Sequence, residues 1–397
     1  MNKDDFPMLN NEVYYFDNSA TTLKPKAVIK AIVDYYENYS GNAHRGDYDI
    51  SLRVDNVYES VREKVRSLIN ANKTSEIIFT SGATASLNMI VSGFFKHQLK
   101  EGDEVLITNA EHASLALPWF VLEKEKGIVV KYIELDKNLE LTMDNVMSAV
   151  TNKTKVIALA HVTNVMGDVR PIKEITKYVH DRGIHVVVDG SQSVPHMKID
   201  VKDLDIDFLA FSAHKMLGPT GVGVLYGKHE LLDKLVPTVV GGGMNTVITS
   251  LNEYETKELP WRLEAGTPNI AGVIGFGAAI DYINEIGIEN IERHGRELKR
   301  YAIEKLSTLN NIDIYNPSTE APIIAFNVKN VFSQDTAIYL NKHKICVRAG
   351  NHCAKLLKES LGINNTCRIS FYLYNSKDEI DYLVKVLDNE NILEESL

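Results

Sequence analysis

The sequence predicts an α/β fold with a mostly parallel sheet and a second, smaller α+β domain. Between residues 76 and 227, short apolar runs alternate with amphipathic stretches, as strands and covering helices do in a parallel sheet. The chain has 397 residues, which is more than one domain usually holds. After about residue 270 the pattern changes to long helices and then to strands mixed with helices. We therefore expect a large domain over 15–270 and a small one over 271–397, with residues 1–14 packing on the small domain.

The individual elements follow from the apolar periodicity. Strands are predicted at 76–80, 104–108, 129–135, 155–160, 185–188, 208–211 and 223–226, and helices at 83–96 and 171–181. In the second part a long helical stretch, 273–309, breaks near Gly287. It is followed by predicted strands at 312–315, 323–328, 345–348 and 368–372, and by helices at 336–342 and 377–388. The segment 241–259 opens with three glycines and is predicted to be an extended loop that contacts a second subunit.

Composition and charge exclude several classes of protein. The net charge of −10 makes nucleic acid and anionic membranes poor partners. No apolar run reaches the length of a membrane span, and the first residues lack the apolar core of a signal peptide. The 3 cysteines do not suggest a disulfide framework, and no Cys or His spacing predicts a metal site. These features predict a reduced, cytoplasmic protein.

His214 and Lys215 stand between the apolar run 208–211 and a glycine-rich turn. A lysine there would project at the carboxyl edge of the sheet, where it could form a Schiff base with an aldehyde cofactor. Asp189 ends the preceding predicted strand. An amine for the aldehyde and a carboxylate for a pyridinium nitrogen are the groups that pyridoxal 5'-phosphate (PLP) needs most. Each residue alone would more simply be a surface lysine or a turn aspartate, but the pair favours a PLP site.

Further polar groups could hold the phosphate of such a cofactor. The turn before the predicted helix at 83–96 offers backbone N–H groups and the hydroxyl of Thr84, although a plain N-cap would need only one hydroxyl. Ser212 and His214 could add donors to the same phosphate. These residues predict a phosphate cradle beside Lys215.

Other candidates follow strands at the same edge of the sheet. His112 could stack on a pyridine ring, and Gln192 could donate to the ring oxygen. Asn164 could hold a substrate carboxylate or the ring oxygen, and Arg368 could clamp a carboxylate through two hydrogen bonds. The alternatives are a structural histidine, a turn asparagine and a strand-end surface arginine.

Cys353 is the candidate nucleophile. It follows a predicted strand and has Arg348 and His352 close by, and nearby positive charge favours the reactive thiolate. Burial as a small hydrophobe is the commoner fate of cysteine and suits Cys346 and Cys367 better. The polar run before Cys353 is unlike a core strand, so we expect a reactive thiol.

Several motifs together carry a family resemblance over nearly the whole chain. They are Tyr15-Phe-Asp-Asn-Ser-Ala-Thr-Thr, His44-Arg-Gly, Ser212-Ala-His-Lys-Met-Leu-Gly-Pro-Thr-Gly, Trp261-Arg-Leu-Glu-Ala-Gly-Thr-Pro-Asn and Arg348-Ala-Gly-Asn-His-Cys-Ala. With them the chain resembles the SufS-type (group II) PLP-dependent cysteine desulfurases, which are class V aminotransferases of fold type I. It departs from that family at Asn351 and Ala113, where a histidine is usual.

The resemblance implies a role for each candidate. Lys215 would carry the cofactor and act as the base, Asp189 would pair with the pyridinium nitrogen, and His112 would stack on the ring. Gln192 would touch the ring oxygen. The phosphate would be held by Thr84, Ser212 and His214 and by Thr267 of a neighbouring subunit. Asn164 and Arg368 would bind the substrate carboxylate, Cys353 would attack the substrate sulfur, and His44 and Arg45 would line the cavity mouth.

The activity implied is conversion of L-cysteine to L-alanine with a persulfide on Cys353. A homodimer would then pass the sulfur to an acceptor protein, with iron–sulfur cluster assembly as the implied use. Selenocysteine lyase or cysteine-sulfinate activity is one alternative, and another class V transaminase or epimerase with an idle Cys353 is a second. An inactive scaffold or partner subunit is a third, against which intact Lys215 and Asp189 argue.

Overall fold

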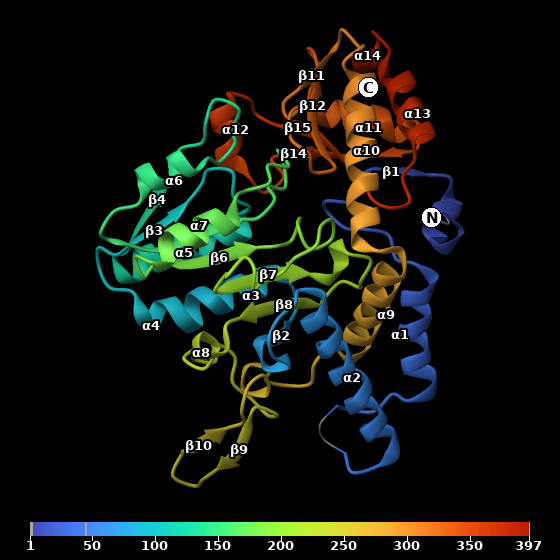
Figure 1. Cartoon of the computed structure of the whole chain (residues 1–397). Coiled ribbons are helices and arrows are strands. Elements are labelled where there is room, and N and C mark those ends of the chain that lie inside the picture. Colours follow the sequence, from blue (N-terminus) through green and yellow to red (C-terminus); the bar gives the residue numbers. More distant parts are fainter. Residues whose placement is uncertain (1–2, 44–45, 397) are drawn as a thin grey trace.

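A seven-stranded sheet forms the centre of the molecule, and a four-stranded sheet lies at one end of it (Figure 1). The computed structural model describes residues 3–43 and 46–396. In the large sheet the order is β2-β8-β7-β6-β5-β3-β4, and every neighbouring pair is parallel except the two that involve β8. The predicted, mostly parallel sheet is confirmed. Its strands are β2 (Ile77–Thr80), β3 (Glu104–Ile107), β4 (Val129–Tyr132), β5 (Thr154–Ala160), β6 (His185–Asp189), β7 (Phe208–Ser212) and β8 (Gly223–Gly227).

Helices cover both faces of the large sheet. Successive strand residues point to opposite faces, so Leu106 and Ile157 join one apolar cluster while Val105 and Val156 join the other. This double coverage explains why the strands are nearly continuous apolar runs in the sequence. The first face is covered by α1 (Lys26–Asn38), α2 (Asp49–Leu68), α6 (Met143–Ala149), α7 (Ile172–His180) and α9 (Ile270–Ile286). The second face is covered by α3 (Ala83–Met89), α5 (Ala113–Lys126) and α8 (His229–Leu232).

The helix predicted at 83–96 is not regular throughout. After α3 the chain forms a π-helical segment, Ile90–Phe95, and then α4 (Lys96–Gln98). The Val236 N–H donates to the Gly93 carbonyl (2.9 Å), and a Cβ on Gly93 would lie 2.7 Å from the Val236 oxygen. The segment that contains Val236 therefore packs directly on the backbone of this helix, at the point where the helix changes from α- to π-type hydrogen bonding.

The C-terminal part builds the smaller sheet, which is antiparallel in the order β11-β12-β15-β14. Its strands are β11 (Ile312–Ile314), β12 (Ile323–Val328), β14 (Arg348–Gly350) and β15 (Thr366–Ser370). Around it lie α10 (Ile288–Leu306), α11 (Ser333–Lys342), α12 (Lys355–Leu361), α13 (Lys377–Leu387) and α14 (Ile392–Ser396). The small α+β unit is thus present.

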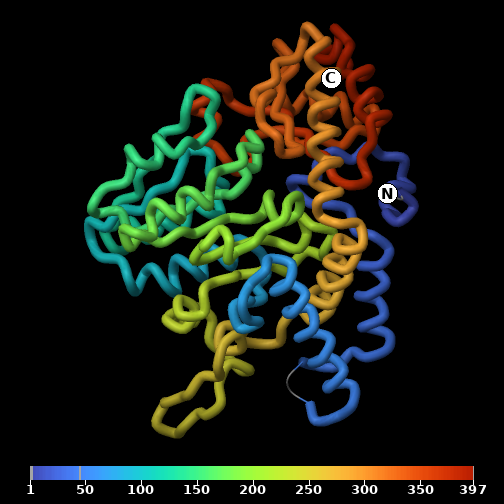
Figure 2. The backbone as a smooth tube through the Cα atoms, viewed as in Figure 1, coloured from blue at the N-terminus to red at the C-terminus, as the bar shows by residue number. Residues whose placement is uncertain are grey.

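The N-terminal residues lie beside this C-terminal part (Figure 2). Strand β1 (Tyr14–Tyr15) pairs in parallel with β13 (Ile345–Cys346), and the ring of Phe6 packs on Tyr374. Helix α9 joins the core of the large sheet, whereas Leu298 and Ala302 of α10 join the core of the small one. The domain limits at 270 and 271 remain a prediction.

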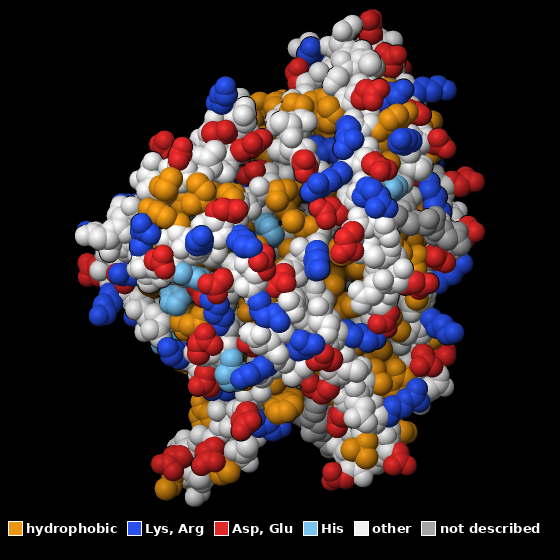
Figure 3. Space-filling view, viewed as in Figure 1, with side chains coloured by type: hydrophobic (Ala, Val, Ile, Leu, Met, Phe, Trp, Pro, Cys, Tyr) orange, Lys and Arg blue, Asp and Glu red, His pale blue; other side chains and the backbone are white. Residues whose placement is uncertain are grey.

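The segment 241–259 differs from the predicted loop. It contains an antiparallel hairpin, β9 (Asn245–Ile248) and β10 (Tyr254–Thr256), which protrudes from the body of the molecule (Figure 1). Ile248 and Leu251 at its end are 74% and 76% exposed, and apolar side chains are visible on this protrusion in Figure 3. The strands are too short to give a periodic pattern. Within the described residues, no helix has both the length and the apolar character needed to cross a bilayer.

Candidate active site

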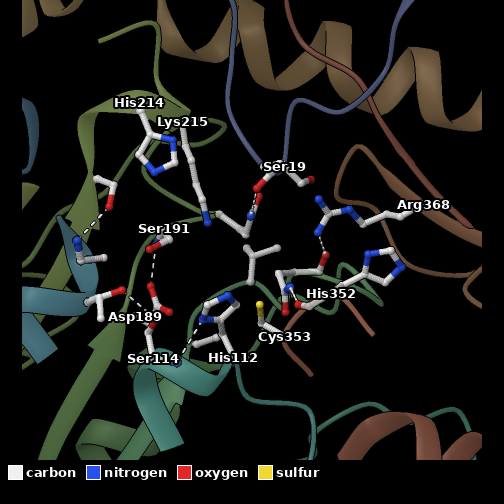
Figure 4. A pocket seen from close by; sticks show the side chains of 18 of the residues that line it. Ser19, His112, Ser114, Asp189, Ser191, His214, Lys215, His352, Cys353 and Arg368 are labelled. Carbon is white, nitrogen blue, oxygen red and sulfur yellow. Dashed lines mark hydrogen bonds between the residues drawn. The ribbon is translucent and has the colours of Figure 1, made fainter. Parts of the chain in front are cut away.

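A cavity of about 210 Å³ opens at the carboxyl ends of the parallel strands, where the large sheet faces β14 and β15 (Figure 4). Strands of one parallel sheet deliver their last residues to one edge, so side chains far apart in sequence converge there. Most of the predicted site residues line it: Thr84, His112, Asn164, Asp189, Gln192, Ser212, His214, Lys215, Cys353 and Arg368.

Lys215 lies in a 3₁₀ turn (Ala213–Lys215) that follows β7 directly, and its amine points into the cavity (Figure 4). Burial lowers the pKa of Lys215 to about 8, with Arg368 and Arg348 adding to the effect and Asp189 opposing it. A lysine with a lowered pKa carries a neutral, nucleophilic amine far more often than a surface lysine does.

Asp189 ends β6 beside Lys215. Its Oδ1 accepts a hydrogen bond from the Ser191 N–H (2.9 Å), which fixes the carboxylate at the strand end. Only 6% of the residue is exposed, so the carboxylate is available to the cavity rather than to bulk solvent.

His112 caps α5 and faces the same cavity. The Ser114 N–H donates to His112 Nδ1 (3.1 Å), so the neutral ring carries its proton on Nε2. Burial, and next the charge of Lys215, lower the pKa of His112. The ring is therefore a neutral surface with one N–H donor, which suits stacking on a flat aromatic ligand.

The residues of the predicted phosphate cradle lie together at the turn before α3. The Ala83 N–H donates to Ser212 Oγ (2.8 Å), and the hydroxyls of Thr84 and Ser114 are 2.7 Å apart. A Cβ on Gly223 would lie 2.3 Å from Gly82 Cα, so glycine at the start of β8 lets the turn approach the sheet. Burial lowers the pKa of His214 to about 4, which leaves it neutral.

Unsatisfied polar atoms test whether a polar ligand fits. Ser19 Oγ, Asn164 Oδ1 and Arg368 Nε are buried without a hydrogen-bond partner among the described residues, and all three residues line the cavity. Leaving such atoms unpaired is costly, and a ligand that bears oxygen and nitrogen atoms would satisfy them. The residue set, an amine, a carboxylate, a neutral imidazole and a hydroxyl-rich turn, fits PLP.

Cys353 lies on the loop between β14 and α12, with its thiol on the cavity side (Figure 4). Gly350, His352 and Cys353 all have positive φ (122°, 52° and 57°). Two of these are not glycine, which is an unfavourable backbone that neighbouring structure must hold in place. Strain of this kind gathers at functional loops.

Hydrogen bonds to three other segments of the chain hold the loop. The Ala113 N–H donates to the Cys353 carbonyl (2.8 Å), and Asn164 Nδ2 donates to the His352 carbonyl (2.7 Å). His352 Nε2 lies 3.0 Å from the Thr366 carbonyl. The loop that carries the thiol is therefore tied to the element that carries His112.

His352 does not provide the positive charge that the sequence suggested for it. Its ring is buried, and burial together with Arg368 lowers the pKa of His352 to about 2, so it is neutral. Positive charge in the cavity comes instead from Arg348 and Arg368, which are cross-strand partners on β14 and β15.

Arg368 is buried and already partnered. One nitrogen of its guanidinium lies 3.2 Å from Asp17 Oδ1, and another donates to the Asn164 carbonyl (2.9 Å). Burial raises the pKa of Asp17, and Arg368 opposes that rise. A substrate carboxylate at Arg368 would therefore share the guanidinium with Asp17.

Thr267, His44 and Arg45 are the remaining predicted residues. Thr267 is exposed and does not line this subunit's cavity. Both observations are compatible with the predicted role of Thr267 at a neighbouring subunit. His44 and Arg45 lie outside the described residues.

Sequence reasoning assigned no role to Asp17, Ser19, Ser114 or Ser191, and it used Arg348 only as a neighbouring charge. Asp17 and Ser19 belong to the first motif of the family resemblance, which was the signal available for them. Ser114 and Ser191 follow His112 and Asp189 by two residues, so each could have been sought as a partner of the neighbouring candidate.

Comparison with known proteins identifies the family. A model of the family described as "Aminotransferase class-V" matches residues 14–383. A probable cysteine desulfurase of Halalkalibacterium halodurans is 45% identical over 388 residues, which cover 96% of this chain and 95% of that protein. A cysteine desulfurase of Haloferax volcanii is 39% identical over 377 residues, covering 94% of this chain and 88% of that protein.

Solved structures agree. The apo structure of a cysteine desulfurase from Thermococcus onnurineus NA1 has a TM-score of 0.94 at 40% identity and covers 97% of this chain and 96% of its own. The Escherichia coli cysteine desulfurase CsdA, solved with an S-sulfonic acid, has a TM-score of 0.92 at 36% identity, covering 99% of this chain and 97% of its own. With a family model that spans most of its length and relatives that match it end to end, this chain belongs to the class-V aminotransferases.

Proposed function

We propose that this protein is a PLP-dependent cysteine desulfurase, which converts L-cysteine to L-alanine and places the sulfur on Cys353. The observation that carries the proposal is that Lys215, Arg368 and the thiol of Cys353 line one cavity. A transaminase or epimerase needs the lysine and the arginine but has no use for a strained loop that presents a thiol. The relatives named cysteine desulfurase add support.

The residues divide the work of holding the cofactor. Asp189 would pair with its ring nitrogen, His112 would stack on its ring, and Gln192 would donate to its ring oxygen. Thr84, Ser212 and His214 would hold its phosphate. When bound, PLP supplies an electron sink for the carbanion that forms at the substrate α-carbon.

The chain's own groups then move protons and sulfur. Arg368 orients the substrate through its carboxylate, and Asn164 holds the loop that carries the thiol. Lys215, with its lowered pKa, takes the proton from the α-carbon. The thiolate of Cys353 attacks the substrate sulfur, so a sulfur–sulfur bond forms and the substrate's carbon–sulfur bond breaks. The carbon fragment keeps that electron pair, gains protons and leaves as alanine.

One assay tests the proposal. The purified protein is supplied with PLP, L-cysteine and a reductant, and alanine and sulfide are followed together. Equal amounts of both products are expected. Pyruvate in place of alanine would contradict the proposal, as would alanine without sulfide. Running L-selenocysteine and L-cysteine sulfinate in parallel decides between desulfurase and the related lyase activities.

We further propose a homodimer whose partner completes each cavity, a separate sulfur-acceptor protein, and a cytoplasmic location. Thr267 is supported as a residue that acts across the interface because it is exposed and is not part of this subunit's own cavity lining. Ile29, Val33 and Tyr36 on α1 are 44%, 43% and 63% exposed, which is unusual for one helix face in a monomer. Light scattering at assay concentration tests the dimer, and an active monomer would exclude it.

A further inference from the structure

A second polar cavity, of about 260 Å³, lies away from the active site. It is formed by α10 and the loop that joins β11 to β12, both in the C-terminal part of the chain (Figure 1). Its polar lining is Arg296, Lys299, Arg300, Ser318, Thr319 and Glu320. It shares no lining residue with the active-site cavity, so nothing in the proposed function accounts for it.

Lys299 is the unusual member of this lining. Only 2% of the residue is exposed, and its Nζ donates to Thr319 Oγ1 (2.5 Å). Among the described residues no carboxylate lies within ion-pair distance of it. Burial lowers the pKa of Lys299 to about 7. The charges of Glu320 and Glu140 oppose this lowering only in part. A buried ammonium without a directly paired carboxylate is costly, and an anion in the cavity would reduce that cost.

The other charges at the cavity leave one more cation available. Arg296 is paired with Glu292 (2.8 Å) and with Glu320 (3.2 Å), so its single positive charge is shared by two carboxylates and is not available to a ligand. Arg300, which follows Lys299 in the chain, has no ion pair or hydrogen bond with any described residue. Lys299 and Arg300, which are consecutive residues of α10, therefore both present positive charge to the cavity.

Hydroxyl groups complete the lining. Thr319 Oγ1 donates to the Met166 carbonyl (2.6 Å), so it meets Lys299 as an acceptor. Ser318 lies beside it at the rim, where its hydroxyl donates to Glu140 (3.1 Å). Glu140 and Glu320 are acidic groups whose charges act on Lys299, so both oppose an anion at this rim.

From this lining we infer that the cavity binds a small phosphate-class anion, either free phosphate or the phosphate group of a monoester. Lys299 supplies a point charge at the bottom of the cavity, and Arg300 supplies a fork of N–H donors at its mouth. Tetrahedral oxyanions accept hydrogen bonds in several directions, which suits donors that come from the floor and the side of one cavity.

The hydroxyl of Thr319 links this cavity to the segment that contacts the active-site loop. Thr319 connects Lys299 with the Met166 carbonyl, and Met166 lies two residues after Asn164. Asn164 in turn holds the His352 carbonyl of the loop that carries Cys353. An anion on Lys299 therefore lies at one end of a hydrogen-bonded connection to the active-site loop.

Calorimetric titration with inorganic phosphate tests the inference. The protein is saturated with PLP beforehand, so that the cofactor's own phosphate site is filled. One saturable site is expected for the wild type. Lys299→Met and Arg300→Gln should each weaken phosphate binding by about tenfold or more, because each removes a charge-assisted hydrogen bond. Lys305→Met, on the same helix outside the cavity, removes the same charge and should leave the affinity unchanged.

The arms of the experiment separate the possible outcomes. Glycerol phosphate that binds as well as inorganic phosphate identifies a monoester site, and inorganic phosphate alone identifies a free-ion site. No saturable binding to the wild type overturns the inference, as does unchanged affinity in Arg300→Gln, an exposed position whose change leaves the fold intact. Binding of acetate or citrate without binding of phosphate also overturns it. None of these results depends on desulfuration, so the two proposals fail separately.

Discussion

The ring of His352 is fixed on Thr366 and turned away from the thiol of its neighbour Cys353 (Figure 4). Adjacent residues in the chain thus have different surroundings: the thiol is exposed on the cavity side, and the imidazole is buried and hydrogen-bonded to Thr366. His352 cannot exchange a proton with the thiol from this position, and its lowered pKa keeps it neutral at any working pH. Its contribution is to hold an unfavourable backbone.

This relationship predicts how His352 variants behave. His352→Ala should lower the rate of persulfide formation about tenfold, because the loop loses a buried hydrogen bond. His352→Gln, which can still donate to Thr366, should recover most of that rate. The pH profile of kcat should have the same shape in all three proteins. A limb of the profile that disappears in His352→Gln would show that the imidazole titrates during the reaction. His97→Ala, an exposed histidine, is the control.

Lys215 and Asp189 give a spectroscopic prediction. Lys215→Ala should lose the visible absorbance of the wild-type protein with PLP, because the covalent link to the cofactor needs the amine. Asp189→Asn should keep the cofactor and the fold but lower turnover by about a hundredfold or more, since the ring nitrogen loses the carboxylate that keeps it protonated. Absorbance spectra and turnover measured on the same samples check both. Wild-type turnover in a loaded Asp189→Asn enzyme would exclude the role.

The sheet and the main site residues could be predicted because local patterns encode them. Strands buried on both faces leave apolar runs, and residues at the ends of parallel strands meet at one edge, so Lys215, Asp189 and His112 converge. The hairpin at 245–256 and the π-helical segment gave no such pattern. The first depends on strands of a few residues, and the second on contact with Val236.

Contacts between distant parts of the chain could not be predicted from the sequence. Asp17 reaches Arg368 because β1 pairs with β13 and carries the following residues over β15. The direction of the His352 ring depends on Thr366 and on burial by the small sheet. Neither follows from spacing or periodicity, because both depend on how two separately predicted units come together.

The pairing of Arg368 with Asp17 predicts a binding defect. Arg368→Gln should raise KM for L-cysteine at least about tenfold, because charge-assisted hydrogen bonds to the substrate carboxylate are lost. Asp17→Asn should lower KM or leave it nearly unchanged, since the guanidinium is then no longer shared with a second carboxylate. Steady-state kinetics with cofactor-saturated protein measures both. An unchanged KM in Arg368→Gln would leave Arg368 with a structural role alone.

A histidine at the opposite edge of the sheet predicts a pH dependence of stability. His180 Nδ1 lies 2.8 Å from Asp205 and Nε2 lies 3.3 Å from Asp207, and the hydrogen bond to Asp207 is the main cause of the raised pKa of His180. Lys228 also faces both carboxylates, and His185 faces Asp207. A raised folded-state pKa stabilises the protein fully below the unfolded-state value, and that contribution is lost as pH rises through the folded-state value.

His180→Asn should therefore destabilise the protein by about 1 kcal/mol at pH 6 and by less at pH 9, with the partial exposure of the pair keeping the effect modest. Thermal unfolding of both proteins at the two pH values measures the difference. His97→Asn should show no such dependence. Equal destabilisation at pH 6 and pH 9 would mean that His180 acts through packing rather than charge.

The last prediction concerns Cys353. Cys353→Ser should keep the cofactor, its colour and the binding of L-cysteine. The thiol is needed neither for the covalent link between Lys215 and the cofactor nor for binding of the phosphate. It should lose persulfide formation and nearly all cysteine desulfuration, since a hydroxyl is a far poorer nucleophile than a thiolate at neutral pH. Selenocysteine can still react, because selenium leaves with less help.

Mass spectrometry places the transferred sulfur directly. After brief exposure of the wild type to L-cysteine, one extra sulfur should appear on the peptide that contains Cys353. The peptides with Cys346, half-buried in β13, and Cys367, buried in β15, should be unchanged. Cys346→Ser is the matched control and should desulfurate cysteine normally. Extra sulfur on either other peptide, or desulfuration by Cys353→Ser at the wild-type rate, would refute the desulfurase proposal. The strained loop would then present a thiol that the reaction does not use. A transaminase or epimerase would take the place of the desulfurase.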